Sequence, residues 1–151
     1  MFRARFARLV PVNETGHSDT LTEGIRVRVA AEFLPSQSEP AERRYAFVYR
    51  VVLENEGELP AKLMSRHWII TDAEGEVREV KGPGVVGKMP DLAPGERFEY
   101  MSGSELRTPW GTMEGSYELL REDGERFQAQ IGRFFLAEST APIEALDETG
   151  V

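Results

Sequence analysis

Apolar and polar residues alternate with a period of two along most of this 151-residue chain, which restricts it to a fold built from β-strands. In the segment 24–34, Ile25 and Val27 fall on one side, while Arg26 and Arg28 fall on the other. Successive side chains of a strand point to opposite faces, so this pattern is typical of a half-buried strand. Six further segments show the pattern, namely residues 44–55, 61–72, 76–82, 97–103, 111–122 and 126–138.

Seven strands joined by short turns, with no amphipathic helix, predict an all-β fold, an antiparallel β-sandwich of the immunoglobulin or fibronectin type III class. The chain has no cysteine, so the disulfide of immunoglobulin domains is absent and the fibronectin-like variant is favoured. We expect one sandwich domain at residues 24–137. An N-terminal extension at 1–23 precedes it, and an acidic C-terminal tail at 138–151 follows it.

The composition excludes several classes of partner. The chain carries 26 acidic and 18 basic side chains, a formal net charge of −8, and this charge repels nucleic acids and anionic membranes. With no cysteine and only two histidines, it lacks the usual transition-metal ligands, and we expect no cofactor. Carboxylate-only sites for hard cations stay open. No apolar run is long enough to span a membrane and no signal peptide is evident, so we expect a cytoplasmic protein.

Residues 82–87 read GPGVVG, the G-x-G-x-x-G pattern that holds a pyrophosphate in dinucleotide-binding folds. In those folds a helix begins directly after the glycines, and its N-terminus binds the phosphate. Here Pro90 and Pro94 follow within a few residues and prevent a helix of useful length. The sequence therefore rejects a Rossmann-type site.

Two interpretations of the glycine loop stay open. In the first, the backbone N–H groups of Gly82, Gly84 and Gly87 form a nest for a small phosphate anion, such as pyrophosphate or the phosphates of a nucleotide. Lys81 and Lys88 flank the motif and would supply positive charge. In the second, the glycines only permit a positive φ or a close approach of the backbone.

Four segments are distinctive when taken together, namely SRHWIITD at 65–72, GPGVVG at 82–87, LAPGERFEYMSG at 92–103 and TPWGTMEGSYEL at 108–119. These segments resemble the motifs of the ApaG family of small bacterial proteins. Together with a weaker likeness in residues 44–55, they occur in the family's order and extend the resemblance over about residues 24–137. Several motifs in register are far more specific than the glycine pattern alone.

The resemblance implies a fibronectin type III-like sandwich, in agreement with the strand pattern. It supplies no established catalytic residues. A nucleotide or pyrophosphate site has been suggested for the family's glycine loop, which would map onto Gly82, Gly84 and Gly87. This chain departs from the family at Lys88 and Met89, because the family usually has a glutamine before its proline.

Trp110 is the aromatic residue that most favours a binding role. It lies between Pro109 and Gly111 in a predicted loop. If the indole is exposed, it would anchor a protein partner; if it is buried, it would cap one end of the sandwich.

His67 lies on the predicted strand 61–72, and it is either a structural residue or an acid–base or phosphate-binding group. Alternation places His67 with Leu63 on one face and places Arg66 and Trp68 on the other. We find no catalytic residues and no metal site. We therefore favour a non-catalytic binding or interaction module over the alternative, a phosphate-ligand protein or enzyme that uses residues 82–88.

Overall fold

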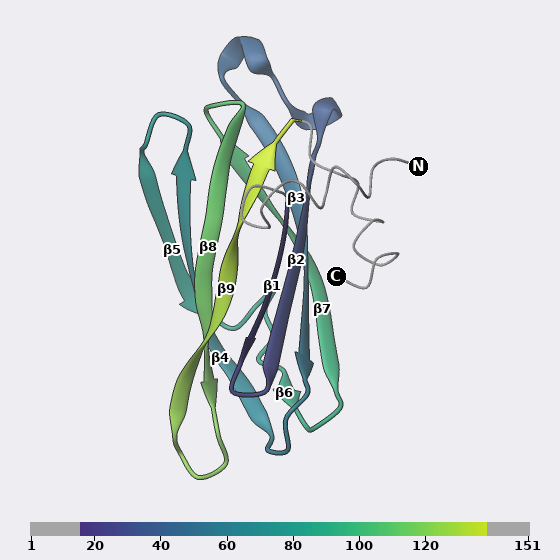
Figure 1. Ribbon diagram of the computed structural model, residues 1–151. Coiled ribbons are helices and arrows are strands. Elements are labelled where there is room, and N and C mark those ends of the chain that lie inside the picture. Colours follow the sequence, from purple (N-terminus) through teal and green to yellow (C-terminus); the bar gives the residue numbers. More distant parts are fainter. Residues whose placement is uncertain (1–15, 139–151) are drawn as a thin grey trace.

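The structure is a computed structural model that describes residues 16–138, and in this part of the chain nine β-strands and two short 3-10 helices follow one another (Figure 1). The strands are β1 (His17–Thr22), β2 (Ile25–Phe33), β3 (Tyr45–Asn55), β4 (Ala61–Asp72), β5 (Val77–Pro83), β6 (Asp91–Leu92), β7 (Arg97–Leu106), β8 (Trp110–Leu120) and β9 (Arg126–Ala137). The 3-10 helices η2 (Pro35–Gln37) and η3 (Pro40–Glu42) lie between β2 and β3.

The strands form two antiparallel sheets that pack face to face (Figure 1). One sheet has the order β1-β2-β3-β7 and the other has the order β5-β4-β8-β9, with the short β6 paired to β4. This arrangement confirms the antiparallel β-sandwich that the sequence predicts.

Two strands, β1 and β6, were not predicted. β1 lies within residues 1–23, which we expected to be an N-terminal extension, yet it pairs with β2 along its whole length. That prediction was wrong for residues 17–22, because β1 is a polar edge strand without apolar alternation. β6 has two residues and is too short for a periodic signal. Residues 1–15 and all but the first residue of the predicted tail at 138–151 lie outside the described residues.

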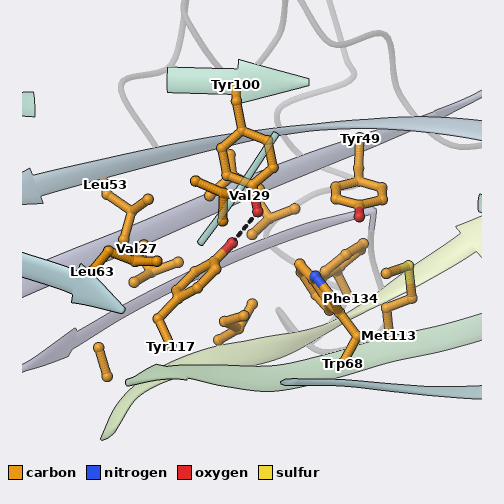
Figure 2. Packing of buried hydrophobic residues seen from close by; sticks show 14 of the residues in the cluster. Val27, Val29, Tyr49, Leu53, Leu63, Trp68, Tyr100, Met113, Tyr117 and Phe134 are labelled. Atoms are coloured by element: carbon orange, nitrogen blue, oxygen red, sulfur yellow. Dashed lines mark hydrogen bonds between the residues drawn. The ribbon is translucent and has the colours of Figure 1, made fainter. Parts of the chain in front are cut away.

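The core lies between the two sheets and is rich in aromatic side chains (Figure 2). Trp68 packs against Tyr49 and Phe134, with ring centroids 5.2 and 6.0 Å apart. Tyr100 of β7 and Tyr117 of β8 share a hydrogen bond between their hydroxyl groups, which joins the two sheets in the middle of the core (Figure 2). Burial raises the pKa of both tyrosines above the ordinary value of 10.0, so both hydroxyls are protonated at neutral pH.

A β-bulge in β4 changes the face on which part of this strand lies. The register with β8 shifts between Leu63 and Ser65, and Leu63 is fully buried while Met64 is only half-buried. The predicted grouping of Leu63 with His67 on one face was therefore wrong. An extra residue at a bulge reverses the alternation, and period-two reasoning does not detect it. Beyond the bulge the prediction holds, and Arg66 shares the inward face with Trp68.

The two long sides of the sandwich differ. On one side β9 packs against both β1 and β2. Across this contact Thr20 Oγ1 donates to the carbonyl of Gln130, and the N–H of Gln130 donates to Thr22 Oγ1. On the other side, the edge strands β5 and β7 are separated by a cleft of about 620 Å³. The core is therefore sealed at β1–β9 and hollow at β5–β7.

Candidate functional site

The glycine loop forms a tight hairpin turn rather than an open loop. The N–H of Lys88 donates to the carbonyl of Val85, and the N–H of Val85 donates back to the carbonyl of Lys88. Both N···O distances are 2.8 Å. Val86 and Gly87 have φ of 42° and 80°, which is the left-handed pair that a two-residue hairpin turn requires. Gly87 suits this geometry at no steric cost, whereas Val86 adopts it under strain.

Gly84 and Gly82 each permit a close approach. A methyl group at Gly84 would lie 2.3 Å from the carbonyl oxygen of Lys88, and the N–H of Gly84 donates to the carbonyl of Met64. A methyl group at Gly82 would lie 3.0 Å from both Nη atoms of Arg66. The Arg66 guanidinium therefore lies directly over Gly82. Its Nη1 donates to the carbonyls of Pro83 and Gly84, and each N···O distance is 2.9 Å.

Phosphate binding by this loop stays a prediction. Within residues 84–88, the N–H groups of Gly84, Val85 and Lys88 donate to backbone carbonyls, which leaves those of Val86 and Gly87 at the exposed tip. Lys88 is exposed on the turn. Lys81 pairs with His67 on the outer face of the sheet and so points away from the side on which Gly82 meets Arg66.

The cleft between β5 and β7 gathers polar groups around an aromatic and aliphatic floor. Arg66 of β4 and Arg78 of β5 enter it from one sheet, and Ser102 and Ser104 of β7 enter it from the other. Arg78 also crosses the opening, because its Nη2 donates to the carbonyl of Glu105 at an N···O distance of 3.0 Å. Its remaining lining residues are Leu34, Gln37, Ala46, Phe47, Val48, Tyr49, Trp68, Ile70, Val80, Gly103, Glu105 and Met113.

Arg66 is the central charge of this cleft. Burial raises the pKa of Tyr49, and a hydrogen bond with Ser102 and the positive charge of Arg66 partly oppose that rise. The same charge opposes the rise in the pKa of Tyr100 and Tyr117. The guanidinium field therefore reaches all three core tyrosines.

Trp110 lies at the start of β8, on the outer face of its sheet, and not in a loop as the sequence suggested. Its indole is 43% exposed and stacks on Phe135 of β9, with ring centroids 5.8 Å apart and an interplanar angle of 20°. The sequence left open whether the Trp110 side chain is exposed or buried, and the structure shows that it is exposed. The prediction that Trp110 binds a partner is untested by this geometry.

His67 also lies on the outer face, where its Nε2 is 2.7 Å from Oε1 of Glu79. Within residues 16–138, no group of three or more acidic or histidine side chains is arranged to hold a metal ion. In the same range, no helix is long and apolar enough to cross a membrane.

Sequence reasoning missed the cleft residues, although two signals pointed to them. Arg66 occupies an inward position on a predicted strand, next to Trp68 in the alternation. Ser102 and Ser104 likewise continue the inward face that starts with Phe98 and Tyr100. A charged or hydroxyl side chain at a core position usually has a binding or structural partner, so these positions could have been selected.

Comparisons with known proteins agree with the fold and its motifs. A family model described as the ApaG domain matches residues 35–121. The protein ApaG of Aromatoleum aromaticum is 58% identical over 113 residues, which cover 75% of this chain and 89% of the relative. ApaG of Ectopseudomonas mendocina is 55% identical over 113 residues, covering 75% and 90% of the two chains.

Solved structures show the same fold. A Bordetella pertussis protein solved by crystallography is 46% identical and has a TM-score of 0.74, covering 87% of this chain and all of that one. The family match over more than half of this chain, joined by relatives of such identity, shows that the protein belongs to the ApaG family.

Proposed function

We propose that this protein is a non-catalytic binding module and that a partner protein docks on the outer face of the β5-β4-β8-β9 sheet at Trp110. The exposed stack of Trp110 on Phe135 carries this proposal. Tryptophan is among the residues that contribute most to protein–protein affinity. The stack presents a large apolar surface whose orientation is already fixed, so little side-chain entropy is lost on binding.

The stack belongs to a larger apolar area. Val77 of β5, Thr71 of β4, Thr112 of β8 and Phe135 of β9 are successive cross-strand neighbours in one row. Val77 is 60% exposed. Valine, threonine and aromatic side chains on the open face of a sheet form a surface without long flexible groups, which suits a rigid interface core.

Polar side-chain pairs border this row. Arg133 lies 3.1 Å from Glu114, and His67 lies 2.7 Å from Glu79. Glu79 and Glu114 are in the next row of the same face, on either side of Ile69, and His67 is one row further along the strand. An apolar centre with a polar rim is the usual composition of a protein interface.

The titratable groups support a non-catalytic role. The pKa of Tyr49, Tyr100 and Tyr117 is raised by burial, which keeps these hydroxyls from exchanging protons near neutral pH. His67 is outside the cleft and interacts with a carboxylate on the open face of a sheet. This geometry differs from that of a general base facing a substrate pocket.

The test is site-specific photo-cross-linking in cells of the source organism. A benzoylphenylalanine at Thr112, beside Trp110, is expected to give a discrete adduct, and one at the exposed Leu21 of the opposite sheet is expected to give none. The cross-linked protein is identified by mass spectrometry and then purified for titration against the full chain.

In that titration Trp110→Ala is expected to weaken the partner by about thirtyfold, as for a central interface tryptophan. Leu59→Ala is the matched control, because Leu59 is 61% exposed and precedes β4 at the end of that strand far from Trp110. Equal adducts at positions 112 and 21, or equal affinity for the Trp110→Ala variant and the wild type, would contradict the proposal.

A further inference from the structure

The cleft between β5 and β7 has the size and lining of a small-molecule site. Its volume of about 620 Å³ is within the range of ligand pockets. Trp68 and Val80 are cross-strand partners and form its floor, together with Phe47, Ile70 and Met113. An apolar floor of this kind favours an aromatic or branched aliphatic group.

Arg66 offers unused donors to this cleft. A guanidinium has five N–H donors, of which Nη1 holds two. Nη1 donates to the carbonyls of Pro83 and Gly84, so its capacity is filled. The Nε and Nη2 edge has no acceptor, and Arg66 has no carboxylate within ion-pair distance, among residues 16–138. That edge is the fork that binds a carboxylate or phosphate through two parallel hydrogen bonds.

Hydroxyl groups lie along the opposite wall of the cleft. Ser102 and Ser104 point inward from the edge strand β7, facing the sheet that carries Arg66. The Oγ atom of Ser104 is buried and has no hydrogen-bond partner. Two other described side chains also have an unpaired buried atom, Ser18 and Arg28, but neither lines this cleft. An unpaired buried hydroxyl is costly in a sealed core and useful beside a polar ligand.

The charge around the cleft favours an anion. A second hollow of about 410 Å³ adjoins the first and shares Arg78 and Glu105 with it. The charged residues of the two linings are Arg43, Arg44, Arg66, Arg78, Arg107, Glu42 and Glu105. Five arginines against these two glutamates and Glu74, which pairs with Arg43, leave a local positive excess in a chain of net charge −8. Such a local field raises the concentration of anions at the opening.

We propose that the β5–β7 cleft binds a small organic anion, a carboxylate or a phosphate monoester with an apolar body. The anionic group pairs with the free edge of Arg66, and the apolar body covers Trp68 and Val80. Ser104 donates to one of the remaining oxygens, and Arg78 closes the opening over the ligand.

The GPGVVG motif has an indirect role in this site. Gly82 makes room for the Arg66 guanidinium, and the carbonyls of Pro83 and Gly84 hold it in one orientation. The motif therefore positions the Arg66 guanidinium that binds the anion. The anion itself does not contact the loop N–H groups. This site is on the inner face of the sheet, whereas the proposed protein interface at Trp110 is on the outer face, so each proposal can fail alone.

The experiment uses the full chain with Trp110→Phe, which leaves Trp68 as the single tryptophan of the chain. Fluorescence is followed during titration with phenyl phosphate and with phenylacetate, whose comparison separates the two anion types. Benzyl alcohol lacks the charge, and inorganic phosphate lacks the apolar body. At least one aromatic anion is expected to saturate the signal at millimolar concentration, with both controls weaker by about tenfold or more.

Variants then locate the site. Arg66→Gln is expected to lower the affinity for the aromatic anion by about tenfold. Arg66→Lys is expected to lower it by less, because lysine keeps the charge and loses only the two-pronged hydrogen bonding. Arg97→Gln is the control, since Arg97 is on the outward face of β7 and pairs with Glu99. If Arg66→Gln does not fold, Ser104→Leu, which fills the cleft from an edge strand, must abolish binding. Absence of saturable binding, equal binding of either control compound, or unchanged affinity in these cleft variants overturns the proposal.

Discussion

Where β1 meets β9, small side chains bring the two sheets into contact, whereas between β5 and β7 the sheets stay apart around arginines and serines. On the sealed side, a methyl group at Gly132 would lie 2.9 Å from Cγ2 of Thr20, so the strands touch without space for a side chain. On the hollow side, Arg66 and Arg78 occupy positions that apolar residues could fill.

The difference indicates that close packing explains the side chains of the sealed side, whereas it does not explain those of the hollow side. Filling the hollow side with apolar residues would bury more surface and stabilise the fold. The chain instead keeps an unpaired hydroxyl at Ser104 and a partly unused guanidinium at Arg66. Groups that cost stability and line a cleft indicate a binding role.

The largest expected effect is a steric one, and it differs between the sealed and the hollow side. Gly132→Val on the sealed side is expected to lower the free energy of unfolding by about 3 kcal/mol, because its methyl groups would force β1 and β9 apart. Gly103→Val on the hollow side is the matched change. A methyl group there meets only the carbonyl oxygen of Phe47, at 3.4 Å, so stability is expected to rise by up to about 1 kcal/mol. Urea denaturation measures both, and equal losses would contradict the contrast.

The next effect concerns the hydroxyl pair that links β7 to the opposite sheet. Tyr117→Phe is expected to lower stability by about 2 kcal/mol, because it leaves the buried hydroxyl of Tyr100 without a partner. The double variant, with Tyr100→Phe added, is expected to regain part of that loss, because no polar group is then left unpaired. Additive losses in this double-mutant cycle would show that the two hydroxyls do not interact.

The same pair predicts a loss of stability at high pH. Folding raises the pKa of Tyr100 and Tyr117, so their contribution is present below the ordinary value of 10.0 and is lost as the pH rises above it. At pH 11 the loss is expected to be about 1.4 kcal/mol for each tyrosine. The double phenylalanine variant is expected to lose correspondingly less between pH 9 and 11. A parallel decline in both proteins would rule out the tyrosines as the cause.

The smallest effect tests the hollow side directly. Ser104→Val replaces an unpaired buried hydroxyl with an apolar group of similar shape, so stability is expected to stay constant or to rise by up to about 0.5 kcal/mol. Ser18→Val is the comparison on the sealed side, where the methyl groups press against β9 and stability is expected to fall. Thermal unfolding measures both changes. A clear loss for Ser104→Val would indicate a hidden structural role for this hydroxyl.

The fold could be predicted from the sequence because seven strands alternate strongly and the turns between them are short. β1 was missed because an edge strand that packs through Ser18 and Thr20 needs no apolar alternation. The bulge at Leu63 was missed because one inserted residue leaves no mark on composition. Local periodicity thus indicates which segments are strands and does not show where a strand changes face.

The candidate site was predicted only in part. The glycine motif was visible, and so was the exposed or buried alternative for Trp110. The role of Gly82 depends on the guanidinium of Arg66, which comes from a strand sixteen positions earlier in the chain and is brought there by pairing. The cleft depends on the separation of β5 and β7, which belong to different sheets. No local pattern encodes that separation.

The central claim is that the hollow β5–β7 side binds anions and that the glycine loop acts through Arg66. Amide NMR of the full chain during a phenyl phosphate titration tests it most directly. The claim predicts the largest shifts at residues 102–105, at Val80 and at Arg66, with those of Val86 and Gly87 unchanged. If the largest shifts occur at residues 86–88 and the cleft residues do not respond, the loop itself is the anion site and the claim is contradicted.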